Sequence, residues 1–128
     1  METISIGATT RSPAIEFNFK NNSYVIKGES YPEDVTAFYG PLMEKLEAHV
    51  SGLKGATIGF RFELVYFNSS TAKILMRLFE LLEAAATRSN QVVITWVYEE
   101  GDDNIKELAE EFAEELKKAK FVFEEVPV

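Results

Sequence analysis

The chain has 128 residues, 46% of them hydrophobic, which is enough to bury the core of one domain, and we predict a single domain over residues 1–128. Its net charge of −8 argues against nucleic acid and membrane surfaces as partners, because both carry negative charge. The sequence contains no cysteine, no apolar run long enough to span a membrane and no signal-peptide pattern, so we expect a cytoplasmic protein.

Apolar and polar residues alternate at the start of the chain, a pattern typical of strands that bury one face. Residues 4–6 can form a short strand, and residues 14–20 form the first clear one. Asn21 and Asn22 then predict a two-residue turn, because Asn tolerates a positive φ angle. A second strand over residues 23–27 completes the predicted β-hairpin.

A loop over residues 28–33 leads into the first predicted helix. Pro32 forbids helix at the preceding residue and, like Glu33, suits a first helical turn. The apolar residues that follow recur at helical spacing: Val35, Phe38, Tyr39, Leu42, Met43, Leu46 and Val50. Gly40 and Pro41 interrupt this pattern, which predicts a kink or a broken first turn.

The second half of the chain alternates strand and helix. Its predicted elements are a strand at 57–66, a helix at about 70–87, a strand at 91–98, a third helix and a strand at 120–126. The strand at 57–66 is expected to bury alternate residues: Ile58, Phe60, Phe62, Leu64 and Tyr66. Asp102 or Asp103 can cap the third helix. The inner stripe predicted for that helix consists of Ile105, Leu108, Phe112 and Leu116.

These elements give the order β-β-α-β-α-β-α-β. The strands at 14–20 and 57–66 each have one apolar face and one polar face. A sheet covered by helices on both sides would instead contain nearly continuous apolar strands. We therefore predict an α/β fold with a mixed β-sheet whose helices pack mainly on one face. This is the layout of STAS-type domains, the architecture of anti-sigma-factor antagonists.

Residues able to carry out catalysis are sparse. His49 is the single histidine and is expected at the surface, near the negative end of its helix, so a catalytic triad or a histidine metal site would depend on it alone. The glycines match no phosphate-binding loop, and the acidic residues at 99–103 lack the spacing of a calcium-binding loop. We therefore predict no enzymatic activity, no cofactor and no metal site.

The junction between the strand at 57–66 and the next helix carries Asn68, Ser69, Ser70 and Thr71. These residues can form a plain helix N-cap or a phosphorylation site. A phosphate there would meet free N–H groups and the positive end of the helix dipole, which stabilise an anion by about 0.3–2 kcal/mol. It would also add a charge of roughly −1.5 to −2, enough to disrupt an apolar docking surface. Both interpretations stay open on these residues alone.

Five segments, in this order, resemble the SiaC family of regulatory phosphoproteins: Ser30-Tyr31-Pro32-Glu33, Leu64-Val65-Tyr66-Phe67-Asn68-Ser69-Ser70, Leu81-Leu82-Glu83-Ala84-Ala85, Trp96-Val97-Tyr98 and Leu108-Ala109-Glu110-Glu111-Phe112. The resemblance implies a STAS-like fold and a bacterial partner-switching module without catalytic activity. In such a module a Ser/Thr kinase phosphorylates the protein and a PP2C-type phosphatase removes the phosphate. The unphosphorylated form binds and activates a diguanylate cyclase, which links the module to cyclic-di-GMP signalling and biofilm formation.

The resemblance places the phospho-acceptor on Ser69, directly after Asn68, where the family has threonine. Ser70 is the second candidate and Thr71 the third. Tyr31, Glu33 and Asn68 lie in the shared segments, and we expect them to shape the partner-binding surface around Ser69.

Two other functions fit the same residues. One is an anti-sigma-factor antagonist acting in transcriptional partner switching, and the other is a small hydrolase with Ser69 or Ser70 as nucleophile. Lys73, one helical turn after Ser69, is either a contact for a phosphate or an ordinary solvated lysine. We expect the free protein to be a monomer.

Overall fold

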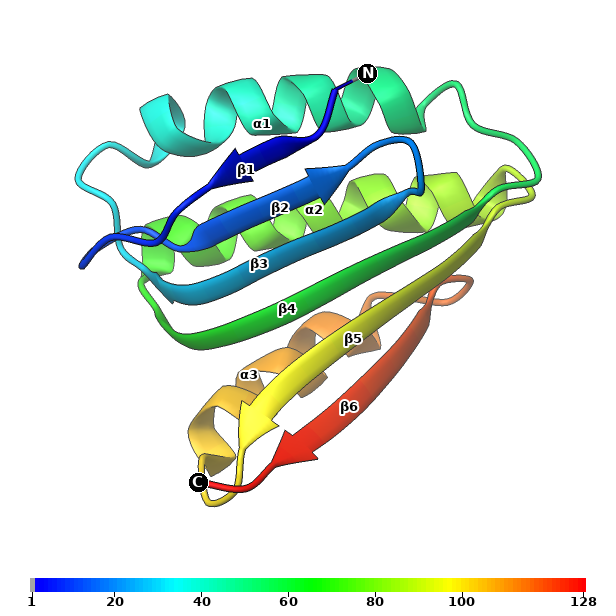
Figure 1. Cartoon of the computed structure of the whole chain (residues 1–128). Helices are drawn as coiled ribbons and strands as arrows, with labels where there is room; N and C mark the ends of the chain where they lie inside the picture. The colour runs from blue at the N-terminus through cyan, green and yellow to red at the C-terminus, as the bar shows by residue number, and fades with distance from the viewer. Residues whose placement is uncertain (1) are drawn as a thin grey trace.

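The computed structural model describes residues 2–128, which form one six-stranded sheet and three helices (Figure 1). In chain order the elements are β1 (Ile4–Ile6), β2 (Ala14–Asn18), β3 (Ser23–Ser30), α1 (Val35–Val50), β4 (Thr57–Phe67), α2 (Ser69–Thr87), β5 (Gln91–Glu99), α3 (Asp103–Glu114) and β6 (Lys120–Val126). The predicted order is confirmed, and the short strand at 4–6 is present as β1.

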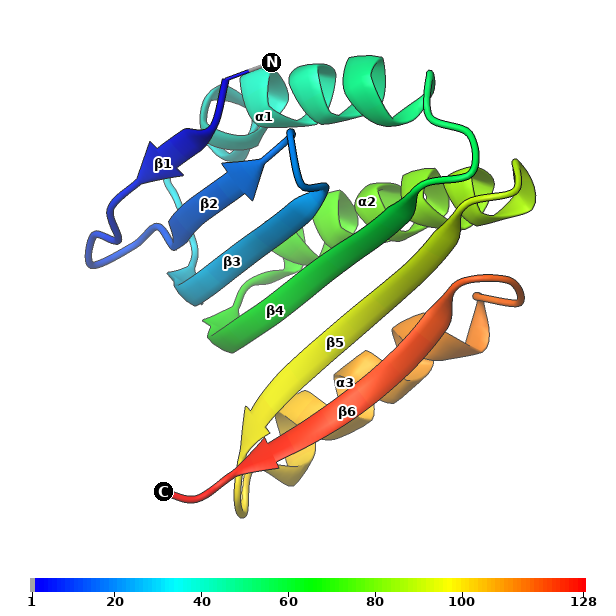
Figure 2. The ribbon, with the colours of Figure 1, turned by 45° about the vertical axis from the view of Figure 1, so that its right-hand side comes forward.

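The strands lie side by side in the order of the sequence, from β1 to β6. The first three pair antiparallel, whereas β3–β4, β4–β5 and β5–β6 pair parallel, so the sheet is mixed as predicted. Each parallel pair is joined through one helix. Because such crossovers share one handedness and the strand order never reverses, α1, α2 and α3 must all lie on the same side. Figures 1 and 2 show the three helices behind the sheet.

The core lies between the helices and one face of the sheet. Its largest fully buried side chains are aromatic or aliphatic: Trp96, Tyr24, Tyr39, Phe19, Phe60, Phe62, Ile15, Ile26, Leu46, Ile58, Leu64 and Leu75. Along β4 the rings of Phe60 and Phe62 stack 4.7 Å apart, and Phe62 stacks on Trp96 of β5 at 5.5 Å. On the opposite face Arg61 forms salt bridges with Glu63 and Glu124, as expected for a surface that meets water.

The hairpin differs from its prediction at both ends. Strand β2 ends at Asn18 rather than at residue 20, and the turn occupies residues 19–22, with Asn22 at φ 51°. Strand β3 continues to Ser30, three residues beyond the predicted end, because β4 pairs with it over that whole length. Gly28, at φ 119°, allows this extension through a conformation that other residues rarely adopt.

The helix boundaries also need correction. Helix α1 begins at Val35, because the side chain of Asp34 accepts the N–H of Ala37 and caps it; Pro32 and Glu33 precede the helix. The helix runs through Pro41 without a break.

Helix α3 is capped by Asp102, one of the two predicted residues. Leu108, predicted on its inner stripe, is 41% exposed, and fully buried Ala109 takes that place against the core. Leu116 lies beyond the end of the helix at Glu114 but still packs against the core.

Candidate functional site

The carboxyl ends of β3 and β4 meet at one edge of the sheet. Ser30 is paired with Phe67, so the residues that follow each strand, Tyr31 and Asn68, are brought together. The backbone N–H of Asn68 donates to the carbonyl oxygen of Ser30 at 3.2 Å. The beginning of α2, which carries Ser69, is therefore fixed beside the end of β3.

A β-bulge lies just before this junction. Gly28 pairs with Leu64, but Glu29 pairs with Tyr66, which leaves Val65 as an extra residue in β4. Because side chains alternate along a strand, one extra residue reverses the side to which the following residues point. Tyr66 is therefore 49% exposed and Val65 46% exposed, while Phe67 enters the core. The prediction that Tyr66 belongs to the buried face is wrong.

The exposed tyrosine has an aromatic neighbour. The ring of Tyr31 meets that of Tyr66 edge-on, with the centroids 5.7 Å apart. The backbone N–H of Tyr31 donates to the carbonyl oxygen of Arg11 at 2.7 Å, and the guanidinium of Arg11 contacts the carboxylate of exposed Glu33 at 2.6 Å. Tyr31 and Glu33 thus lie on one surface loop beside the junction.

Asn68 is the cap of α2. Its side-chain oxygen accepts the backbone N–H of Thr71 at 2.9 Å, and its carbonyl accepts the N–H of Ala72 at 2.9 Å. Ser69 and Ser70 occupy the first two helical positions, and both are exposed. Within residues 2–128, their backbone N–H groups have no hydrogen-bond partner. The N-cap interpretation is correct for Asn68, and it leaves both serine hydroxyls free.

Thr71, by contrast, is completely buried in a polar network. The hydroxyl of Ser30 lies 2.6 Å from that of Tyr39 and 3.0 Å from that of Thr71, which donates to the carbonyl of Ser30 at 3.0 Å. The Thr71 proton is thereby committed, so Ser30 donates to Thr71 and Tyr39 donates to Ser30. Burial raises the pKa of Tyr39 to about 12. This network joins β3, α1 and α2 beneath the exposed serines.

This network was not predicted from the sequence. The signal in the sequence is faint: a serine ends a strand, and no local pattern pairs it with Tyr39 or Thr71. Lys73, considered above as a phosphate contact, is exposed on α2 one turn after Ser69.

His49 lies far from the serines. It is half-buried rather than on the open surface, its ring nitrogen Nε2 is 2.9 Å from the side-chain oxygen of Asn22, and its ring packs against Phe19. Asn22 precedes the start of β3, whereas Ser69 lies beside the opposite end of that strand. The imidazole therefore cannot serve as a base for Ser69 or Ser70. In the described part of the chain, no group of three His, Cys, Asp or Glu residues is arranged to hold a metal ion.

A sequence model of the SiaC family regulatory phosphoproteins matches residues 6–126. The chain belongs to this family. An uncharacterised protein of Pseudomonas aeruginosa strain UCBPP-PA14 is 30% identical over 116 residues, which is 90% of each chain.

Of residues 2–128, none lies in a helix long and apolar enough to cross a membrane.

Solved structures of the family share this fold. The crystal structure of apo-SiaC from P. aeruginosa is 28% identical, with a TM-score of 0.84 over 97% of this chain and 99% of that one. A chain in the crystal structure of the diguanylate cyclase SiaD with its activator SiaC, from the same organism, is 26% identical. Its TM-score is 0.87 over 96% of this chain and 99% of that one. The STAS-like fold is thus confirmed. A homologue of this chain activates a diguanylate cyclase, which is a regulatory role and not a catalytic one.

Proposed function

We propose that this chain is a non-catalytic, phospho-regulated adaptor whose unphosphorylated form binds and activates a diguanylate cyclase. A cognate Ser/Thr kinase phosphorylates Ser69 and thereby blocks the complex, and a PP2C-type phosphatase restores it. The observation that carries this proposal is the position of Ser69: an exposed hydroxyl at the first residue of α2, three residues after exposed Tyr66, whose neighbour Val65 is also exposed.

We assign the phosphate to Ser69 and not to Ser70 because of the helix face on which each serine lies. Residues four and seven positions apart share one face of a helix. Ser70 therefore shares its face with Ile74, which is buried toward α1, and with exposed Arg77. Ser69 shares its face with exposed Lys73 and exposed Met76. At these spacings Ser69 has only exposed neighbours, whereas Ser70 has one buried neighbour, which favours Ser69 as the residue that a kinase and a phosphatase can reach.

The start of α2 is also suited to hold a phosphate. The unpartnered N–H groups of Ser69 and Ser70 and the positive end of the helix dipole favour an anion by about 0.3–2 kcal/mol. Lys73 adds a positive charge one turn along the helix. Phosphorylation at Ser69 therefore leaves the fold of the domain intact.

The same phosphate weakens the binding of a partner to the surface beside Ser69. Tyr31, Val65 and Tyr66 present apolar surface near Ser69, and a partner that covers them must remove their water. A charge of roughly −1.5 to −2 at Ser69 retains its hydration shell and makes that removal costly. Asn68 supports the surface by fixing the start of the helix, and Glu33 supplies a charged border held by Arg11.

The test combines phosphosite mapping with capture of partners from the native host. Mass spectrometry of the purified protein is expected to find phosphate on Ser69, and the unphosphorylated Ser69→Ala protein is expected to co-purify with a diguanylate cyclase. A Ser70→Ala protein serves as the matched control and keeps its phosphorylation. Phosphate on Ser70 alone would contradict the assignment of the acceptor. Capture of a sigma-factor-binding kinase in place of a cyclase would favour the anti-sigma-factor antagonist instead.

A further inference from the structure

A second surface, separate from the start of α2, lies between α2 and α3. The groove between these helices has a volume of about 670 Å³. Phe79 of α2 and Phe112 of α3 meet there with ring centroids 5.1 Å apart, and half-buried Leu116 continues the apolar lining. Met76 stands at its edge with 51% of its surface exposed. We call this surface the α2–α3 groove.

Carboxylates border the groove on both sides. Glu80 and Glu83 come from α2, and Glu111 and Glu115 come from α3 and the residue after it; no lysine or arginine is among the described residues that line it. The carboxylate of Glu83 accepts the backbone N–H groups of residues 117, 118 and 119, which fixes the chain after α3. Within residues 2–128, the other three carboxylates form no salt bridge.

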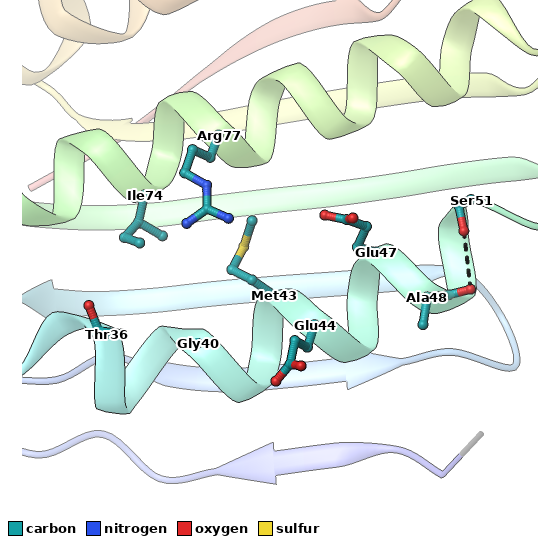
Figure 3. A pocket seen from close by; sticks show the side chains of 9 residues that line it. All are labelled: Thr36, Gly40, Met43, Glu44, Glu47, Ala48, Ser51, Ile74 and Arg77. Carbon is teal, nitrogen blue, oxygen red and sulfur yellow. Dashed lines mark hydrogen bonds between the residues drawn. The ribbon is translucent and has the colours of Figure 1, made fainter.

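The groove on the other side of α2 has a different character. It lies between α1 and α2, and Figure 3 shows Arg77 from α2 and Glu47 from α1 both reaching into the space between the helices. Glu44 lines the same space. Charges of both signs are thus present there, whereas the α2–α3 groove combines an apolar lining with charge of one sign.

We propose that the α2–α3 groove docks an amphipathic helix of a protein partner, with an apolar seam flanked by lysine or arginine on both sides. A third helix laid between two helices buries its apolar stripe in this way, and basic residues beside the stripe meet carboxylates on both borders. From Met76 to Thr87 the groove follows α2 for about 16 Å, or about three turns of a bound helix.

A second copy of this chain does not fit as the occupant. The chain carries a net charge of −8, and α3, the most amphipathic candidate to enter the groove, exposes glutamates. Two acidic borders would then face each other. The groove begins at Met76, about two turns along α2 from Ser69, so binding at the groove can be tested without changing Ser69.

The experiment uses the full chain labelled with nitrogen-15 and a synthetic helical peptide of about four turns, with leucine along one seam and lysine on both sides. A second peptide replaces every lysine by glutamate. Backbone amide shifts map the binding site, and fluorescence anisotropy gives the affinity. The test variant is Glu111→Lys/Glu115→Lys, which reverses one border. The matched control is Glu29→Lys/Glu44→Lys, which makes the same change in net charge at exposed residues outside the groove.

We expect the lysine peptide to shift amides along the α2–α3 groove and the glutamate peptide not to bind. The Glu111→Lys/Glu115→Lys protein is expected to bind the lysine peptide at least about tenfold more weakly, and the control to bind within about twofold of wild type. Circular dichroism checks that both variants are folded. Equal weakening in the two variants, shifts spread over the acidic surface, or equal binding of the glutamate peptide would overturn the proposal.

Discussion

The buried network under the phospho-acceptor gives a sharp prediction. Thr71→Val keeps the shape of the side chain but removes the hydroxyl that donates to the carbonyl of Ser30 and accepts from its side chain, both at 3.0 Å. That carbonyl still accepts the N–H of Asn68, whereas the fully buried hydroxyl of Ser30 is left without an acceptor. Two lost hydrogen bonds at about 0.5–1.5 kcal/mol each predict a loss of about 1–3 kcal/mol in the free energy of unfolding.

Urea denaturation measures this loss, with fluorescence of Trp96, the single and fully buried tryptophan, as the signal. Ser69→Ala is the matched control and should change the free energy of unfolding by less than about 0.5 kcal/mol, because its hydroxyl is exposed. In a double-mutant cycle with Tyr39→Phe, the two losses should be non-additive by about 0.5 kcal/mol or more. A Thr71→Val protein as stable as wild type, or fully additive losses, would refute the network.

Two further predictions concern pH and the chain after α3. Burial raises the pKa of Tyr39 and of Tyr24 to about 12 from 10.0, so the folded state favours their neutral forms. The two tyrosines contribute fully to the free energy of unfolding below pH 10, and this contribution is lost as pH rises through about 12, by roughly 1.4 kcal/mol per pH unit for each tyrosine. Urea titrations at alkaline pH should therefore show that the free energy of unfolding of Tyr39→Phe falls less than that of the wild type. Burial alone would raise the pKa of Glu83, but the three backbone N–H groups that it accepts hold its pKa below 4.5. The charged carboxylate therefore contributes to the free energy of unfolding above pH 4.5, and this contribution is lost in acid. Glu83→Gln should therefore cost about 1 kcal/mol at neutral pH and less in acid, and an equal cost at both would contradict this role of the charge.

The order of the elements was predictable because it rests on local patterns. The buried face of each element sets the spacing of its apolar residues, which alternate in β2 and β4 and follow helical spacing in α1 and α2. These spacings can be recognised from the sequence alone. The one-sided arrangement of the helices followed from the polar outer face of the strands. The strand β6 was also predicted with its observed bounds.

The exposure of Tyr66 was not predictable from the sequence. Leu64, Tyr66 and Phe67 are all apolar or aromatic, so either an unbroken register or one with a bulge would bury a large side chain. Pairing with β3 decides between them, and that contact is made between residues far apart in the chain. Leu108 and Ala109 present the same difficulty in α3, where the smaller residue is the one that packs inward.

The polar residues at the start of α2 were predicted from the sequence, but their burial and their contacts were not. The sequence located the cap and the hydroxyls, and family resemblance singled out Ser69. Only the structure separates exposed Ser69 and Ser70 from buried Thr71. The contacts responsible join Ser30 and Tyr39 to Thr71 across three elements, and no spacing within the sequence encodes them.

The most direct test of the phospho-switch is the activity of the cognate diguanylate cyclase with protein that carries phosphoserine at position 69, installed during translation. Unmodified protein and Ser69→Ala are expected to bind the cyclase and raise its production of cyclic di-GMP to the same level. Phosphoserine at 69 is expected to weaken binding at least about tenfold and to abolish activation at matched concentration. Binding and activation equal to those of the unmodified protein would contradict the account.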